Sequence, residues 1–214
     1  MSPLYLSQKK WRLLLRPLIE IKQLRKKYNG TLVLNDLTFT IYENEFLVIM
    51  GASGAGKSTL LNIIGKLDSD FEGEIHYSDE IFSGNNVPLP FVFQEFESLL
   101  PWKTVEENIL LVSPHSSALE MDNVLNEVAL IEHRHKYPDA LSGGMKQRVG
   151  VARALICHSK VLFMDEPFGS LDRELRGKLQ DFIKQIKKDR NMTIVFVTHD
   201  LEEANRLGDR ILRI

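Results

Sequence analysis

The pattern of apolar and polar residues changes character near residue 45. Before it, apolar and polar residues alternate, as in Ile19-Glu20-Ile21-Lys22, and Asn29-Gly30 is a typical hairpin turn. After it, continuous apolar runs such as Phe46–Met50 are separated by segments with helical periodicity. Buried strands that alternate with helices are typical of a parallel α/β sheet. The sequence therefore predicts a mainly parallel sheet core, preceded by an N-terminal antiparallel β subdomain.

The individual elements follow from the same pattern. Short strands are expected over residues 19–22, 33–34, 37–41, 46–50, 73–77, 91–93, 161–164, 193–197 and 210–214. Helices are expected over residues 57–67, 119–131, 145–156, 173–190 and 200–207, and Thr104 with Glu107 forms a capping box that opens one more. We expect one domain over residues 18–214, a helical subdomain inserted in it over about residues 95–157, and a short tail over residues 1–17.

The composition of the chain excludes several classes of protein. The chain has 214 residues, of which 43% are hydrophobic and 26% charged, which is typical of a globular protein with a sizeable core. A net charge of −2 gives no indication of binding to nucleic acid. The single cysteine, Cys157, excludes an internal disulfide and a cysteine-based zinc site. No apolar stretch approaches the roughly 20 residues of a membrane span, so any membrane task would fall to a partner.

The first 17 residues allow two interpretations. Four basic residues surround Trp11 and a run of leucines, a composition that suits a short amphipathic helix on a membrane surface. The same residues also suit a mobile tail or an over-extended start of translation, which is the interpretation that we favour. A signal peptide is not predicted, because the segment has neither an uninterrupted apolar core nor a small-residue cleavage site.

Residues 51–59, which read GASGAGKST, follow an apolar strand and precede a helical pattern. Glycines let backbone N–H groups curl toward one anion, and the start of the following helix adds its positive dipole end. The lysine supplies a charge for the terminal phosphates and the serine hydroxyl a ligand for Mg²⁺. We therefore predict a P-loop NTPase that binds a nucleoside triphosphate and Mg²⁺ through Gly51, Ala52, Ser53, Gly54, Ala55, Gly56, Lys57, Ser58 and Thr59.

Three chemically suggestive positions follow three apolar strands. Gly51, Asp165 and His199 each come at or directly after the end of such a strand, and the carboxyl ends of parallel strands meet at one edge of a sheet. Asp165 is suited to hold Mg²⁺, and Glu166 is placed to orient or deprotonate an attacking water. His199 alone would be a structural histidine, but in this position it becomes a candidate contact to the γ-phosphate.

A second glycine-rich helix start follows Leu141. Ser142 is a good N-cap, and two glycines come directly after it. Such a start is receptive to anions. Taken by itself, however, the segment is better interpreted as an ordinary helix start.

At this point the chain clearly resembles the nucleotide-binding subunit of ABC transporters, from about Leu18 onward. GASGAGKST matches the Walker A loop, VFQE the Q-loop, LSGGM the family signature, VLFMDE the Walker B strand, SLD the D-loop and THD the switch histidine. The resemblance implies that Tyr28 stacks on adenine and that Gln94 contacts Mg²⁺ and the attacking water. It also implies that Glu166 is the catalytic carboxylate, with catalytic contributions from Lys57 and His199, and that Asp172 couples two subunits.

The resemblance further implies a head-to-tail homodimer that encloses two ATP molecules. Each nucleotide would lie between the P-loop of one chain and Ser142, Gly143 and Gly144 of the other, which would explain the second helix start. LLPW, DEPFGSLD and THDLEEA are similar to subunits that power uptake of nitrate, sulfonates or taurine. We therefore expect an ATPase on the cytoplasmic side of a membrane, with membrane-spanning permease subunits and a substrate-binding protein as partners and no nucleic acid.

Other classes of function are weaker alternatives. The STLLNIIGKLD stretch is also similar to exporter and lipoprotein-release ATPases. DNA-maintenance ATPases need long coiled coils or basic surfaces, and translation-associated ABC proteins need two cassettes, none of which is present in this sequence. A nucleotide sensor that does not hydrolyse ATP also stays open.

Two local clusters each allow two interpretations. Phe96 and the segment Leu99-Leu100-Pro101-Trp102 suit a docking surface for a membrane subunit, but Trp102 would equally well pack into the helical insert. His133 and His135 suggest a metal site, although two histidines among charged residues are usually solvated. We predict no metal at the histidines.

Overall fold

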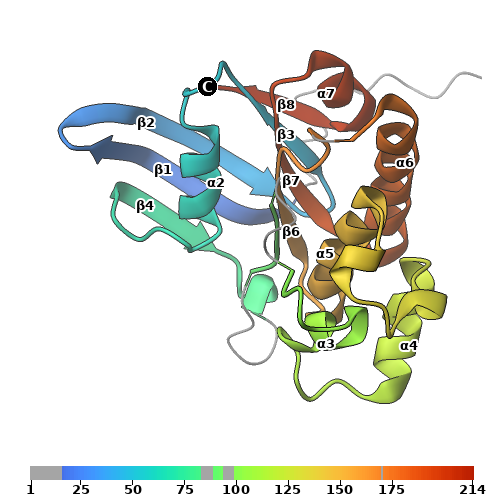
Figure 1. The fold of residues 1–214 in the computed structure, drawn as a ribbon. Helices are drawn as coiled ribbons and strands as arrows, with labels where there is room; N and C mark the ends of the chain where they lie inside the picture. Colours follow the sequence, from blue (N-terminus) through green and yellow to red (C-terminus); the bar gives the residue numbers. More distant parts are fainter. Residues whose placement is uncertain (1–15, 83–88, 94–98, 170) are drawn as a thin grey trace, which may run out of the picture.

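The computed structural model describes residues 16–82, 89–93, 99–169 and 171–214 (Figure 1). Its centre is a parallel sheet of five strands in the order β5-β6-β7-β3-β8. This sheet confirms the predicted parallel α/β core. The strands are β3 (Phe46–Met50), β5 (Phe91–Val92), β6 (Val161–Asp165), β7 (Thr193–Thr198) and β8 (Arg210–Arg213).

A second, antiparallel sheet has the order β2-β1-β4 and confirms the predicted N-terminal β subdomain. Its strands are β1 (Pro17–Tyr28), β2 (Thr31–Tyr42) and β4 (Glu72–Tyr77). Asn29 and Gly30 form the β1–β2 turn with φ of 48° and 80°, as the hairpin turn requires. The expected short strands before residue 42 were wrong in length, because register shifts let two 12-residue strands continue through polar interruptions.

The five-stranded sheet separates two hydrophobic cores. Along β3, Phe46 and Val48 point into one core while Leu47 and Ile49 point into the other, as the two-residue period of a strand requires. One core contains the apolar residues of α2 and of the antiparallel sheet, and the other those of α3–α7. Figure 1 shows this arrangement, with α2 on one side of the sheet and α5 and α6 on the other.

The helices largely follow the predicted pattern. Both bonds of the predicted capping box at Thr104 and Glu107 are present, and Ser142 caps its helix as expected. The helices are α2 (Lys57–Ile64), α3 (Val105–Leu110), α4 (Ala118–Glu127), α5 (Gly143–Ile156), α6 (Arg173–Arg190) and α7 (Leu201–Leu207), with short 3-10 turns over Asp79–Phe82, Ile131–His133 and Pro138–Ala140.

Two predicted helix ends were wrong. Helix α2 ends at Ile64 because the chain turns at Lys66, whose φ of 64° is left-handed, and the amides of Leu67 and Asp68 then bond back to the Asn62 carbonyl. Helix α4 ends at Glu127 because the chain turns at Ala129, whose φ of 55° is left-handed, and does not continue to residue 131. In the described part of the chain, every helix is too short or too polar to cross a membrane.

Candidate nucleotide-binding site

The phosphate loop leaves β3 and leads directly into α2. Gly54 and Gly56 have φ of 81° and 90°, a region that favours glycine. A β-carbon at Gly56 would also lie 2.9 Å from the Val33 side chain of β2. No side chain caps the start of α2, so the first backbone N–H groups of the helix are available to an anion.

The predicted loop residues lie together at the carboxyl end of β3. The Ala55 N–H donates to the Ala52 carbonyl at 3.1 Å, which closes the turn of the loop. Residues 52–54 of the loop are exposed. Ser58 and Thr59 lie in the first turn of α2. Loop and helix start thus have the backbone geometry that a phosphate-binding loop requires.

Lys57 is buried, with 7% of the residue exposed, although it carries a charge. Its Nζ donates to the carbonyl oxygens of Gly51 and Ala52 at 3.1 and 3.0 Å. The carboxylate of Glu166 lies 3.8 Å from the same nitrogen. The ammonium group is therefore held over the loop by acceptors that a phosphate group could replace.

Register brings the three predicted strand ends together. Met50 of β3 pairs with Thr198 of β7, and Val197 of β7 pairs with Asp165 of β6. The residues that follow these strand ends therefore lie at one edge of the sheet. The loop at Gly51, the Asp165-Glu166 pair and His199 share this edge, as the sequence predicts.

Asp165 and Ser58 suit a magnesium ion. Burial raises the pKa of the Asp165 carboxyl, against a smaller lowering by hydrogen bonding with Ser58. Among the described residues, no hydrogen-bond donor reaches the buried Oδ1 of Asp165. A buried, unpaired carboxylate oxygen next to a hydroxyl fits a small cation with oxygen ligands. A bound Mg²⁺ would supply charge neutralisation for the phosphate groups.

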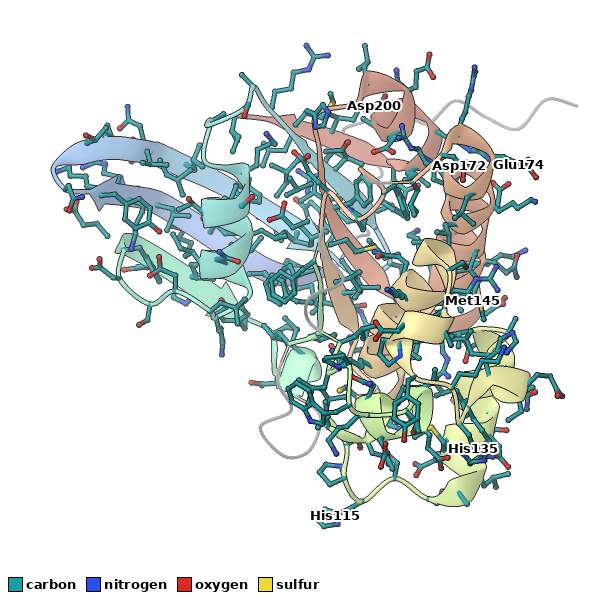
Figure 2. The ribbon with its side chains drawn as sticks, in the orientation of Figure 1. His115, His135, Met145, Asp172, Glu174 and Asp200 are labelled. Atoms are coloured by element: carbon teal, nitrogen blue, oxygen red, sulfur yellow. The ribbon has the colours of Figure 1, made fainter. Side chains whose placement is uncertain are left out.

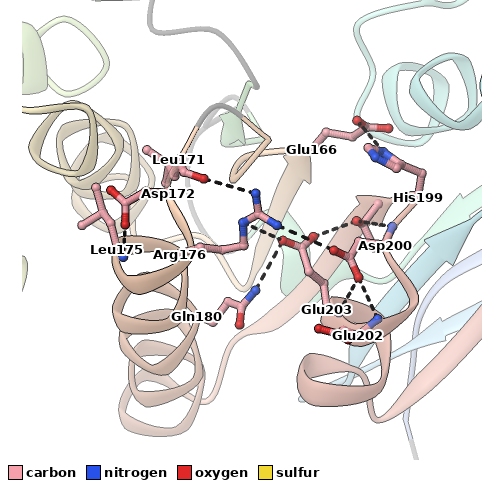
Figure 3. Close-up of polar contacts among 11 residues, drawn as sticks. Glu166, Leu171, Asp172, Leu175, Arg176, Gln180, His199, Asp200, Glu202 and Glu203 are labelled. Carbon is pink, nitrogen blue, oxygen red and sulfur yellow. Dashed lines mark hydrogen bonds and ion pairs between the residues drawn. The ribbon is translucent and has the colours of Figure 1, made fainter.

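Glu166 and His199 face each other across the edge of the sheet (Figure 3). The Nδ1 atom of His199 lies 3.0 Å from Oε2 of Glu166. Glu166 has a φ of 42°, and its N–H donates to the Val197 carbonyl at 3.1 Å. A left-handed conformation at a non-glycine residue costs energy and is concentrated at functional sites. The conformation turns the Glu166 carboxylate back toward both Lys57 and His199.

Tyr28 lies at the end of β1 and is 47% exposed. Its hydroxyl donates to Asp68 at 3.0 Å, and the Lys26 ammonium lies 4.7 Å from the ring centroid. Lys26 is itself buried and lies 2.8 Å from Asp68. Sequence reasoning missed Lys26 and Asp68; the available signal was a lysine on the inward-facing side of β1, two residues after the buried Leu24.

The second glycine-rich helix start, at Ser142, lies away from the phosphate loop in the folded chain. The Ser142 hydroxyl accepts a hydrogen bond from the Met145 N–H, and Gly144 packs closely against Leu175 of α6. Asp172 caps α6 by accepting from the Leu175 N–H at 2.9 Å. Figure 2 places Met145 and Asp172 on the α5–α6 side of the sheet, away from α2. One chain does not bring its two anion-receptive helix starts together.

Some of the residues named in the sequence predictions are not described by the structure. Gln94 and Phe96 lie outside the described residues, as does Ser170 of the SLD motif. The histidine segment is described, and His135 pairs with Glu106 at 3.8 Å. Across the described ranges there is no cluster of three metal-binding His, Cys, Asp or Glu side chains. The proposed magnesium site relies instead on one carboxylate and a hydroxyl.

Comparison with known proteins places these features in a family. The family model described as "ABC transporter" matches residues 34–169, which is more than half of the chain. An aliphatic sulfonates import ATP-binding protein, SsuB of Bacillus licheniformis, is 42% identical over 184 residues, which cover 85% of this chain and 72% of that protein. The nitrate transport protein NasD of Klebsiella oxytoca is 39% identical over 92% of this chain and 80% of its own length.

A solved structure agrees with these relatives. The dimeric structure of MJ0796, a bacterial ABC transporter cassette, is 34% identical and superposes with a TM-score of 0.76, covering 92% of this chain and 94% of that one. The similarity to sulfonate and nitrate transport proteins agrees with the resemblance drawn from the sequence motifs. The chain therefore belongs to the ABC transporter family, as an ATP-binding subunit that hydrolyses ATP.

Proposed function

We propose that this chain powers the import of a small anionic molecule, of the sulfonate or nitrate class, by hydrolysing ATP at the edge of the five-stranded sheet. The observation that carries the proposal is the position of Glu166, whose carboxylate lies between Lys57 at 3.8 Å and His199 at 3.0 Å. The transported class rests on the relatives, which are named for aliphatic sulfonate import and nitrate transport.

In the proposed mechanism, backbone amides of the loop and Lys57 bind the β- and γ-phosphates. Glu166 accepts a hydrogen bond from the attacking water and orients it, and His199 holds both this carboxylate and the γ-phosphate. Ser58, Asp165 and Gln94 would hold Mg²⁺, and Tyr28 would stack on the adenine. Each of these residues binds or orients a group, so most of the rate enhancement would come from positioning and electrostatics.

The proposed active form is a head-to-tail homodimer. Ser142, Gly143 and Gly144 of one chain would close over the ATP held by the loop of the other, and Asp172 would lie at the same interface. The separation of the two helix starts within one chain supports this arrangement, as does the MJ0796 structure, which is that of a dimer. Permease subunits in the membrane and a substrate-binding protein would complete the system, with this chain at the cytoplasmic face of the membrane.

A docking surface for the permease is proposed around Leu99 and Trp102. Trp102 is 70% exposed and so does not pack into the helical subdomain, whereas Leu99 is buried. A large exposed aromatic ring beside an apolar core suits contact with a partner. Replacement of Trp102 by Ala should weaken assembly with the permease and leave the basal hydrolysis of the free chain intact. Unchanged assembly and unchanged stimulated hydrolysis would rule out this surface.

The test of the ATPase proposal is Glu166→Gln. The amide cannot take up a proton, so phosphate release should fall by about 100-fold or more while ATP binding is kept. Glu202→Gln is the matched control, because Glu202 is an exposed carboxylate in the first turn of α7. Phosphate release at the wild-type rate in Glu166→Gln would remove this residue from the mechanism. Compounds of the sulfonate and nitrate class should then be screened for stimulated hydrolysis by the assembled transporter.

A further inference from the structure

Helices α6 and α7 each begin next to a residue of the proposed site. Asp172 caps α6, and Asp200 caps α7 directly after His199. A group of polar side chains fills the space between these two helix starts (Figure 3). The proposed mechanism assigns no role to Arg176, Gln180 or Glu203 of this group.

Arg176 of α6 is at the centre of this group. Its Nη2 donates to the Leu171 carbonyl at 3.1 Å, directly before Asp172. Its Nη1 lies 3.7 Å from Asp200, and its Nε lies 3.7 Å from Glu203. One guanidinium group therefore contacts the segment before α6 and the first turn of α7 at the same time.

Glu203 of α7 extends the contacts to β7. It is buried, with 7% of the residue exposed, and burial raises the pKa of its carboxyl. It accepts a hydrogen bond from the Thr198 hydroxyl at 2.7 Å and one from Gln180 at 3.3 Å. The Thr198 hydroxyl in turn accepts from the Asp200 N–H at 3.0 Å.

His199 lies between Thr198 and Asp200, and both of these neighbours are bound in the group. Glu203 holds the side chain of Thr198, Arg176 lies beside the side chain of Asp200, and the Thr198 hydroxyl binds the Asp200 N–H, so the residues on both sides of the histidine are held. We propose that Arg176 and Glu203 are positioning residues, which hold His199 against Glu166 and join it to the dimer-facing segment at Leu171 and Asp172. The inference rests on the proposed roles of Glu166 and His199.

A simpler explanation is that these side chains only hold α6 against α7. The chain contains a matched control for that explanation, because Arg206 of α7 pairs with Asp181 of α6 at 2.7 Å. This ion pair joins the same two helices at a more exposed position and contacts neither the Leu171 carbonyl nor the residues on either side of His199. If the side chains only hold the two helices together, turnover in both arginine variants should fall only as far as the free energy of unfolding falls.

The experiment compares Arg176→Gln with Arg206→Gln in the full chain. The imidazole signals of His199, assigned with a His199→Gln variant, are followed by NMR without nucleotide, and ATP affinity and turnover are measured separately. Arg176→Gln should shift the His199 signals and lower turnover by about 10- to 100-fold, with the Kd for ATP changed less than about twofold. Arg206→Gln should leave all three unchanged.

A second pair of variants covers the case in which Arg176→Gln does not fold. Thr198→Val removes the hydroxyl that links Glu203 to the Asp200 N–H while keeping the side-chain volume, and Thr198→Ser keeps the hydroxyl. Thr198→Val should reproduce the shifted His199 signals and the lower turnover, and Thr198→Ser should restore both toward wild type. Unshifted His199 signals in Arg176→Gln or Thr198→Val would overturn the inference, as would equal effects of Arg176→Gln and Arg206→Gln. Failure of the proposed function would show separately, as wild-type phosphate release by Glu166→Gln.

Discussion

The two glycine-rich helix starts of this chain differ in how their backbone N–H groups are used. At α2, Gly56 is left-handed, no side chain caps the helix, and the buried Lys57 lies over the loop. At α5, Ser142 has an extended backbone, and its hydroxyl accepts from the Met145 N–H at a long 3.4 Å. Both starts are receptive to anions, but only the first is left entirely without a cap.

This difference shows how one sequence pattern can serve two tasks. The start of α2 has its cation, its hydroxyl and its carboxylates within the same chain, so it can bind a nucleotide by itself. The start of α5 has its own serine as a partner and lies on the other face of the sheet. Its serine binds one of the N–H groups of the helix start, and in the proposed dimer the phosphate of a second chain would bind the others.

The largest expected effect is on ATP affinity in Lys57→Ala. Removal of the buried ammonium should weaken ATP binding by about 100-fold, since charge-assisted hydrogen bonds contribute about 1.5–3 kcal/mol. Lys146→Ala, in the first turns of α5, should leave the affinity of the isolated chain unchanged. Isothermal titration calorimetry on dilute protein measures both variants. Equal losses of affinity would mean that the two helix starts are not functionally distinct.

The next effect is on turnover in Ser142→Ala. If the α5 start acts only on the ATP of a partner chain, turnover should fall by about tenfold while the dilute chain keeps its ATP affinity. Loss of the cap should also lower the free energy of unfolding by about 1 kcal/mol. Ser117→Ala removes the cap of α4 and should cost similar stability but no turnover. If Ser117→Ala also lowers turnover, the loss reflects stability alone.

A smaller effect is expected from an added methyl group at each start. Gly56→Ala should lower the free energy of unfolding by about 1–2 kcal/mol, because φ is 90° and the new atom would crowd Val33 and Leu34. Gly144→Ala should cost less, since the atom that it would meet at 2.7 Å is the end of the flexible Leu175 side chain. Urea denaturation compares the two variants, and a larger loss for Gly144→Ala would contradict the prediction.

The smallest expected effect is on the Tm of Asp165→Asn. Burial raises the pKa of the Asp165 carboxyl in the folded chain above its value in the unfolded chain. The protonated carboxyl therefore adds to the free energy of unfolding at low pH, and this contribution is lost as pH rises through the folded pKa. Asp165→Asn carries no such charge, so without metal its Tm should exceed the wild-type value slightly at neutral pH and not at pH 4. Mg²⁺ should no longer strengthen its ATP binding. The Tm of both proteins against pH is the measurement.

The sequence predicts those features that depend on neighbouring residues. The loop, the apolar strands of the parallel sheet and the capping box at Thr104 all follow from local chemistry, and the structure contains them. The register that brings Asp165 beside β7 was expected only from the general behaviour of parallel strands.

What could not be predicted depends on distant partners. The length of β1 depends on bulges that keep its pairing with β2, and the end of α4 on a left-handed Ala129. The contact of Lys26 with Asp68 crosses 42 positions, and that of Gln180 with Glu203 crosses 23. No periodicity marks such pairs, because each is set by how two separate elements pack.

The place of β3 in the sheet has a consequence for the synthesis of the protein. The strand that carries the phosphate loop is hydrogen-bonded only to β7 and β8, which begin at Thr193 and Arg210. The loop is made before both of these supporting strands, which follow it in the sequence by more than 130 residues. A nascent chain therefore carries the complete GASGAGKST motif long before it can hold that motif in shape, and its capacity to bind ATP should arise only after β7 and β8 have been made.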